Sequence, residues 1–451
     1  MRGRVSVCLL LLVFSSGAWG ETPASRAEEL ESLSLSPLQI VRIARKLIED
    51  GETGAARVLL SKAAFSSQEL EIERLYLLGL LSEKEGDLDE AIEIFHRILD
   101  RHPALARVRL ELALTYMAQG SWYRADYHMR LAGASEDLPE GVPENIKLLL
   151  YIIRQNKNWD VWFNFGLAPD NNVNSSQGGE ECIATIFGVL CRQLPESEKA
   201  VGVNLSLGGN YEYKFDRDWG LKNDLMLFSN TYDESDYDDL YLAASTGPRY
   251  VYPRGDVWVA FTASRRYLGH KPFSYSTGVK IDASHDFTNR LSAGLSLKYS
   301  PTRYDDYGDI LDGDTRGASA RLTCMLGAST YAGLKAGIEK EYTRDKIYTN
   351  RRITLGVNFG AELPAGFRLY IEPSVLFTGY DRARWTVKDY DFKQIKEKSV
   401  TWRYLFSVSN NKIDFWGFTP QILYSYTRRN SNIWQREYAK HALEFSMQRL
   451  F

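Results

Sequence analysis

Two periodicities of apolar residues divide the chain. From Leu35 to Asn158 apolar side chains recur at the three- and four-residue spacing of an amphipathic helix, whereas beyond Trp159 they recur at every second position. The clearest alternating run spans 201–215, where most odd positions are apolar or aromatic and the even positions are polar or glycine. Since period two places successive side chains on opposite faces of a strand, the chain is predicted to be helical first and β-structured afterwards.

The alternating segments predict a membrane-spanning barrel. A closed outer-membrane barrel needs one apolar face toward lipid and one polar face toward water. After the first residues of the chain, no apolar stretch reaches the roughly 20 residues that a transmembrane helix needs, so a membrane-embedded domain has to be a barrel. With weaker segments included, we count fourteen strands within 157–451. The pattern of 201–215 recurs at 273–287, 291–299, 353–363, 367–377, 400–408 and 422–426.

The links between these strands alternate in length, as expected for short periplasmic turns and longer external loops. This alternation disfavours a secreted β-sandwich and places the helical region on the periplasmic side. Short links are 216–218, 253–255, 288–290, 327–329, 364–366 and 410–412. Long links are 170–199, 231–239, 300–314, 381–398 and 428–436, with shorter ones near Gly269 and Arg344.

Both ends of the chain indicate export. Arg2 and Arg4 precede an apolar run that ends near the small residues of 18–20, so residues 1–20 are predicted to be a signal peptide. The last residues alternate apolar and polar side chains and end on an aromatic residue. This is the pattern of a final transmembrane strand that the barrel assembly machinery inserts. The predicted C-terminal signal consists of Phe445, Met447 and Phe451.

The helical region repeats with a period of 34 residues, which is typical of tetratricopeptide repeats. Residues 21–156 are therefore predicted to form an α-solenoid, although a plain helical bundle also fits the periodicity. The first repeat is marked by Leu78, Gly79, Ala91, Phe95 and Pro103, and the second by Leu112, Ala113, Tyr116, Ala125 and Ala132. Ala44, Ala56, Leu60 and Ala63 indicate a degenerate repeat before them.

Stacked repeats present a concave groove lined by the first helix of each pair, which predicts a binding surface for a client protein. The leucines of this set are equally compatible with an ordinary helical core. The predicted groove residues are Glu73, Tyr76, Leu80, Glu83, Arg107, Leu110 and Leu114.

Composition narrows the chemistry. The net charge of −3 gives no basic surface for nucleic acid. Cys182 and Cys191 flank a short loop segment and are predicted to form a disulfide in the oxidising periplasm. No histidine lies near them, so no metal site and no cofactor is expected. The histidines of the predicted barrel have no nucleophile motif around them, and the chain is predicted not to be an enzyme.

Charged loops add one more expectation. The acidic segments 233–239 and 305–314 lack the spacing of a helix-loop-helix calcium site and are predicted to be solvated. Basic residues between Arg382 and Lys398 gather in a later loop. They are candidates to pair with those acids or to meet lipopolysaccharide.

One string near the end of the first strand carries a resemblance. Asp170, Asn171, Asn172 and Asn174 lie in the sequence 168–174, a Pro-Asp-x-Asn-x-Asn motif, and a late strand at 419–426 is followed by Ser-Asn-Ile at 431–433. Together with the signal peptide and the repeats, this order resembles the surface lipoprotein assembly modifier family over the whole mature chain. Asp and Asn are also ordinary turn-forming residues, and that interpretation of the motif stays open.

The resemblance implies an α + β membrane protein: an N-terminal helical solenoid followed by a 14-stranded antiparallel transmembrane β-barrel at 157–451. It implies an outer-membrane translocon that moves lipoproteins, or related soluble binding proteins, to the cell surface. The expected partners are the client, a periplasmic chaperone, the barrel assembly machinery, and outer-membrane lipid and lipopolysaccharide. The alternatives are a polysaccharide exporter, which should have a strongly charged lumen, and a porin-like channel.

Overall fold

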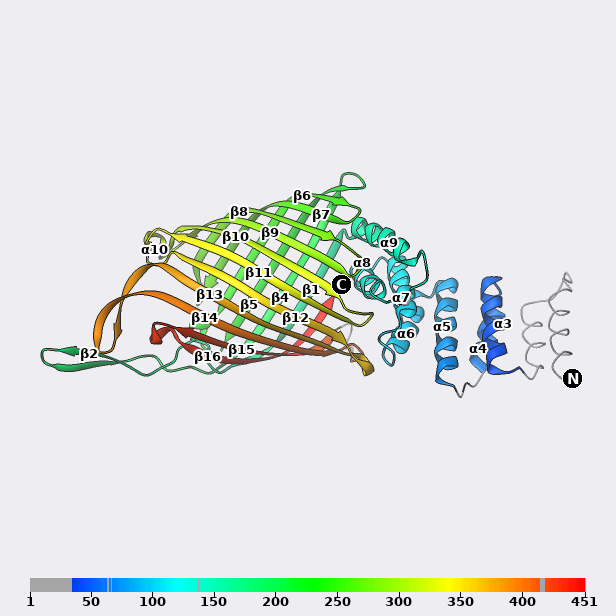
Figure 1. The fold of residues 1–451 in the computed structure, drawn as a ribbon, viewed down its shortest axis with the longest axis horizontal. Helices are drawn as coiled ribbons and strands as arrows, with labels where there is room; N and C mark the ends of the chain where they lie inside the picture. Colours follow the sequence, from blue (N-terminus) through cyan, green and yellow to red (C-terminus); the bar gives the residue numbers. More distant parts are fainter. Residues whose placement is uncertain (1–34, 63–64, 66, 137, 414–417, 451) are drawn as a thin grey trace. The chain divides into compact units, whose positions relative to one another are not determined.

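The computed structural model describes residues 35–450 except 63–64, 66, 137 and 414–417 (Figure 1). The predicted signal peptide and Phe451 lie outside the described residues. Two compact units are distinguished: residues 1–98 with 114–119, and residues 99–113 with 120–451. Helices occupy 37–156 and the first barrel strand begins at Trp159, whereas the division between the units falls within a helix.

The first unit is built of paired helices. Ser36 caps the first helix in a capping box with Gln39, which satisfies backbone N–H groups that the helix leaves unpaired. Within the next pair, Gly79 lies against the buried ring of Phe95, where a Cβ would come within 2.5 Å of the ring. A small residue here lets the two helices approach closely, as the repeat pattern predicted. The helices are α3 (Pro37–Glu49), α4 (Thr53–Lys62), α5 (Gln68–Glu85) and α6 (Leu88–Leu99).

Three further helices, α7 (Ala106–Gln119), α8 (Trp122–Ala132) and α9 (Val142–Asn156), lead to the barrel. The second unit contains α8, α9 and the first part of α7 together with all the barrel strands. Pro143 lies in the first turn of α9, where its missing N–H costs no hydrogen bond. None of the described helices is long and apolar enough to cross a bilayer.

Fourteen antiparallel strands close into a barrel, which confirms the predicted architecture. Each strand pairs with its neighbour along the chain, and the first strand closes on the last. The barrel strands are β1 (Trp159–Asp170), β4 (Ala200–Lys214), β5 (Trp219–Tyr232), β6 (Asp239–Tyr252), β7 (Gly255–Leu268), β8 (Lys271–Asp286), β9 (Leu291–Tyr304), β10 (Gly313–Met325), β11 (Thr330–Thr343), β12 (Asn350–Glu362), β13 (Phe367–Lys388), β14 (Asp391–Asn410), β15 (Thr419–Ser431) and β16 (Tyr438–Leu450).

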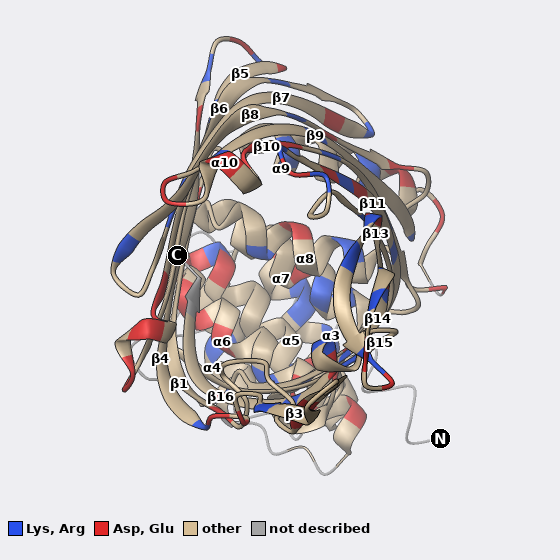
Figure 2. Cartoon of the chain, turned by 90° about the vertical axis from the view of Figure 1, so that its left-hand side faces the viewer, with Lys and Arg blue, Asp and Glu red and all other residues tan. Residues whose placement is uncertain are grey.

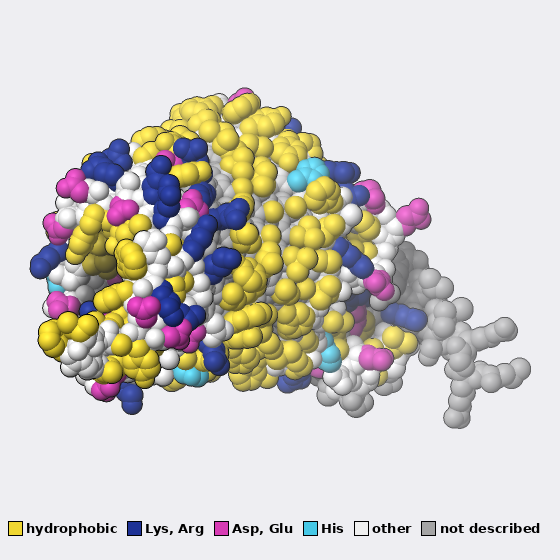
Figure 3. Space-filling view, turned by 60° about the vertical axis from the view of Figure 1, so that its left-hand side comes forward, with side chains coloured by type: hydrophobic (Ala, Val, Ile, Leu, Met, Phe, Trp, Pro, Cys, Tyr) yellow, Lys and Arg dark blue, Asp and Glu magenta, His cyan; other side chains and the backbone are white. Residues whose placement is uncertain are grey.

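Exposed apolar side chains form a belt on the outside of the barrel, and Figure 3 shows one face of it. Its side chains alternate along each strand with smaller or polar residues that face the lumen, as lipid outside and water inside require. Ser264, Ser276 and Ser300, for example, form a hydrogen-bonded row across three strands of the inner face. Exposed members of the belt include Leu207, Leu225, Phe261, Val279, Leu295, Leu334, Leu355 and Phe406.

The predicted long link at 381–398 is wrong. β13 continues to Lys388 and β14 begins at Asp391, so the two strands form one long hairpin with a tight turn at Asp389 and Tyr390, both with positive φ. Outside the membrane a strand pair needs no apolar face, so alternation fades although pairing continues. A register shift between Gly379 and Ala383 marks the place where the hairpin leaves the regular barrel wall.

The seam between β1 and β16 closes the barrel. Phe165 lies opposite Met447, and Leu167 opposite Phe445, so the apolar residues of the last strand continue the outer belt. On the inner side Gly166 lies opposite Ser446, where a Cβ would come within 2.4 Å of the Phe445 carbonyl oxygen. Because that contact is with backbone, the seam tolerates only glycine at position 166 without a shift of the strands.

We therefore expect Gly166→Ala to destabilise the folded barrel by about 1–3 kcal/mol, the usual range for overpacking. Gly294→Ala is the matched control, because the nearest atom to its added Cβ is 3.8 Å away. Urea titration in detergent, followed by the heat-modifiable mobility of the folded barrel, measures both. Equal midpoints for the two variants would contradict the proposed tightness of the seam.

Candidate functional site

Residues of both charge signs occur along the described barrel strands (Figure 2), and several of them form ion pairs across neighbouring strands on the inner wall. Glu339 forms an ion pair with Lys298 at 2.6 Å and a second one with Arg352. Arg249 bridges Glu212 at 2.6 Å and Asp256 at 3.0 Å. Since these charges are compensated across neighbouring strands, the described wall has no dominant sign.

The rim that bears the short turns holds α8 and α9, which lie across this end of the barrel in a view along it (Figure 2). On α8, Tyr123, Asp126, Tyr127 and Arg130 follow the spacing i, i+3, i+4, i+7 and therefore share one face. Three of them contact barrel residues directly. The surface that α8 turns to the barrel is thus a stripe of hydrogen-bonding side chains rather than an apolar one.

One barrel carboxylate joins both helices. Asp286, the last residue of β8, forms an ion pair with Arg130 of α8 at 2.9 Å and another with Arg154 of α9. Arg154 is buried, and its guanidinium also donates to the Pro253 carbonyl at 3.2 Å. Removing one partner from such a buried arrangement leaves an uncompensated charge, which typically costs about 3–5 kcal/mol.

A second carboxylate at the rim joins α7 and α8 to another strand. Arg109 is fully buried and donates to Glu362, the last residue of β12, at 2.6 Å. Tyr127 donates its hydroxyl to the other oxygen of the same carboxylate at 2.9 Å. The two carboxylates lie at separate points of the rim, so the helices are held from two sides.

Electrostatics reinforce the α8 stripe. Burial alone would raise the pKa of Asp126, but the charges of Arg130 and Lys157 outweigh it and hold that pKa well below its usual range. Burial raises the pKa of Tyr123 to about 12, so its hydroxyl stays neutral and donates to Asn210 of β4 at 3.1 Å. The contacts of the stripe are therefore present at neutral pH.

The residues predicted to line a client groove lie on two helices. Tyr76 on α5 is only 7% exposed and packs against Phe95, so it offers little surface to a partner. Glu73 pairs with Arg45 of α3. Leu80 and Glu83 on α5, and Leu110 and Leu114 on α7, are half-buried, while Arg107 is exposed. Binding at these positions remains a prediction.

The four motif residues organise the loop end of the seam. Asp170 pairs with Lys440 of β16 and accepts from the Asn172 backbone N–H at 2.9 Å. The Asn172 amide donates to the carbonyl of Ala439 at 3.0 Å, and Asn171 accepts from the His441 backbone N–H at 2.8 Å. These bonds connect the end of β1 to β16 and thus favour a structural role for the motif.

Asn174 extends the same arrangement to the returning chain. Its amide donates to the Glu196 carbonyl at 2.7 Å, and its oxygen accepts from the backbone N–H of Glu198 at 3.2 Å. The start and the end of the loop between β1 and β4 are thereby held together beside the seam.

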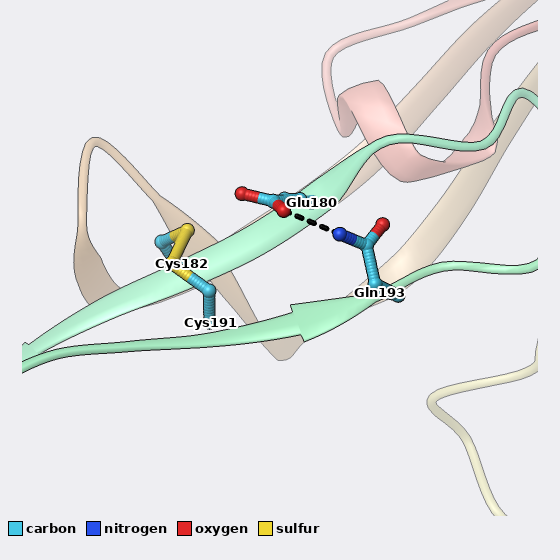
Figure 4. The surroundings of a disulfide bond; sticks show 4 residues. All are labelled: Glu180, Cys182, Cys191 and Gln193. Atoms are coloured by element: carbon cyan, nitrogen blue, oxygen red, sulfur yellow. Dashed lines mark hydrogen bonds between the residues drawn. A yellow bond between two sulfur atoms is a disulfide. The ribbon is translucent and has the colours of Figure 1, made fainter.

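A disulfide between Cys182 and Cys191 closes a hairpin in this loop, as predicted (Figure 4). The hairpin comprises β2 (Glu180–Thr185) and β3 (Gly188–Gln193), and the two cysteines lie directly opposite each other. Ile186 and Phe187 at its tip are each 93% exposed. Among the described residues, the one group with the proximity of metal ligands is Glu180 with these two cysteines, whose sulfurs are already bonded to each other.

Comparison with known proteins decides the family. The sequence pattern of the family described as "Surface lipoprotein assembly modifier" matches residues 159–451, the whole barrel. The chain belongs to this family. A tetratricopeptide repeat pattern matches residues 83–125, within the region predicted to be an α-solenoid. The family is one of assembly modifiers rather than enzymes, and the closed barrel with its apolar belt places this member in the outer membrane.

Three relatives extend the match beyond the barrel. The surface lipoprotein assembly modifier of Pasteurella multocida is 21% identical over 94% of this chain and 85% of its own length. Surface lipoprotein assembly modifier 1 of Haemophilus influenzae is 22% identical over 82% of this chain and 75% of its own. The hemophilin secretion modulator of Acinetobacter baumannii is 20% identical over 83% and 78%, respectively.

Sequence reasoning missed the helix contacts at the rim of this family member. Arg109 and Glu362 are 253 positions apart, and neither belongs to a motif. One signal in the sequence could have indicated these contacts: the polar stripe at helical spacing on α8, formed by Tyr123, Asp126, Tyr127 and Arg130. A polar face that is buried together with the apolar residues of its helix needs a polar partner.

Asp286→Asn should weaken the attachment of α8 and α9 to the barrel by about 3 kcal/mol, because Arg154 stays buried without a carboxylate to pair with. Limited proteolysis of the purified full chain in detergent measures this as faster cleavage within 122–156. Glu144→Gln is the control, since that carboxylate is exposed on α9 and its 3.5 Å pair with Lys147 contributes little. Unchanged protection in Asp286→Asn would show that the ion pairs do not hold the helices.

Proposed function

We propose that this chain delivers a lipoprotein, or a related secreted protein, from the periplasm to the cell surface. The observation that carries the proposal is the family match across the entire barrel, supported by relatives similar over most of their length. Their names refer to surface lipoprotein assembly and, in one case, to hemophilin secretion. The client of this chain is proposed to be of the same kind.

The lumen supports a protein client. A polypeptide presents both signs of charge together with neutral polar groups, and the described wall offers compensated pairs such as Lys298 with Glu339 and Lys335 with Glu372. An exporter of an anionic polysaccharide would favour a wall of one sign. The mixed wall therefore favours a protein over a uniformly charged polymer.

We assign three roles along the chain. The repeats within 21–156 capture the client or a chaperone that carries it, and the barrel within 157–451 supplies the passage. α8 and α9 hold the periplasmic end through Asp286 and Glu362 until a client is engaged. No covalent chemistry is needed for such a process, so no catalytic group is assigned.

Surface exposure of a client tests the proposal. The chain is co-expressed with a lipoprotein encoded beside it, and protease is added to intact cells. We expect the lipoprotein to become accessible only when this chain is present, whereas an unrelated lipoprotein stays protected in the same cells. If no neighbouring candidate gains exposure while the barrel is folded in the outer membrane, the export function is refuted.

The groove is tested separately by charge reversal at an exposed position. Arg107→Glu should lower client delivery roughly fivefold to tenfold, the effect of losing one contributing interface residue. Arg101→Glu is the matched control, because Arg101 is also exposed but lies in the turn before α7. Equal delivery by both variants would place client capture elsewhere.

A further inference from the structure

Four basic residues form a row on the outer face of the barrel. In the strand register Arg316 of β10 lies opposite Lys340 of β11, which lies opposite Arg351 of β12. Gly379 of β13 follows opposite Arg351, and Lys398 of β14 lies opposite Gly379. We call Arg316, Lys340, Arg351 and Lys398 the basic row.

The basic row lies directly above the apolar belt, on the side of the long loops. One step closer to the membrane centre the same strands carry Ala318, Ile338, Ile353, Phe377 and Val400. Lys and Arg side chains gather along this edge of the belt in Figure 3. The row therefore occupies the level of lipid headgroups in the outer leaflet.

Like charges at directly facing positions repel, so such a row destabilises the isolated sheet. Two acids offset it in part: Asp314 accepts from Arg316 at 2.8 Å, and Asp381 pairs with Lys340. Tyr342 lies 4.9 Å from the Arg316 guanidinium, on the side of the long loops. With two acids for four bases, the row keeps a net positive charge and can take up an anion.

Gly379 leaves room for that anion. A Cβ built on Gly379 would meet nothing within 4 Å. Neighbouring strands are about 4.8 Å apart, so Arg351 and Lys398 flank an open space roughly 10 Å wide with no side chain between them. A phosphate group fits such a gap and can accept from both cations.

An apolar hollow opens in the belt beneath the row. The hollow has a volume of about 780 Å³. Its lining includes residues that point outward from the barrel wall: Leu295, Ala320, Leu334, Ala336, Val357 and Trp402. The small pair Ala320 and Ala336, directly opposite each other, helps to form the depression. It begins four residues below the row, about 14 Å along the strands, which an acyl chain spans easily.

We propose that the basic row and the hollow together bind one phosphorylated glycolipid of the outer leaflet, namely the lipid A part of lipopolysaccharide. Its phosphate lies over Gly379 between Arg351 and Lys398, and an acyl chain occupies the hollow. A soluble phosphate would leave the hollow empty, and a neutral lipid would leave the cations without a partner. This site is independent of the proposed export function.

Binding of defined lipids to the purified full chain in detergent tests the site. The probes are diphosphoryl lipid A, dephosphorylated lipid A, a triacylated lipopeptide without phosphate, and inorganic phosphate. The double substitution Arg351→Gln and Lys398→Gln should lower the affinity for diphosphoryl lipid A roughly tenfold to thirtyfold. Gly379→Leu should also weaken it by filling the gap without any change of charge.

Lys388→Gln with Lys396→Gln is the matched control. Both lysines are exposed on the same long hairpin beyond the row, so their loss removes equal charge and should change affinity less than twofold. Heat-modifiable mobility verifies that each variant is folded. Equal binding of dephosphorylated lipid A or of the lipopeptide would overturn the proposal, as would an equal loss in the control.

Discussion

The structure depends on one constraint: within lipid, every backbone N–H and C=O group of a strand must find its partner on another strand. Fourteen strands meet it only if the first pairs with the last, and the β1–β16 seam supplies that pairing. The close contact at Gly166 and the bonds from Asn171 and Asn172 to β16 concentrate there. The motif residues Asn171 and Asn172 thus contribute to the closure of the whole barrel.

Closure also defines two faces with different tasks. The outer face meets lipid and carries the belt, with the basic row where the belt ends. The inner face can be charged because opposite charges are compensated across strands, as Arg249 is by Glu212 and Asp256. At the rim of the short turns, ion pairs of the same kind join helices to strands. Carboxylates at the ends of β8 and β12 hold helices instead of strands.

Much of this fold follows from periodicity, because a strand between lipid and water has to alternate. The strand at 201–215 and the fourteen-strand count were predictable for that reason. The Cys182–Cys191 pair was predictable on other grounds, namely the short segment between the cysteines and the oxidising compartment. The long β13–β14 hairpin was not, since outside lipid nothing enforces alternation. The rim contacts were not predictable either, because Arg109 and Glu362 meet only through tertiary structure. The client groove is still a prediction, and within it the burial of Tyr76 could not be read from repeat spacing.

Asp286 has a consequence for how firmly α8 and α9 are attached to the barrel. Its single carboxylate pairs with Arg130 of α8 and with Arg154 of α9, so two positive charges share one negative charge. A helix that leaves this rim has to give up its ion pair, whereas the remaining arginine keeps the carboxylate without a competing cation. The two helices can therefore detach one after the other, and the loss of the first strengthens the attachment of the second.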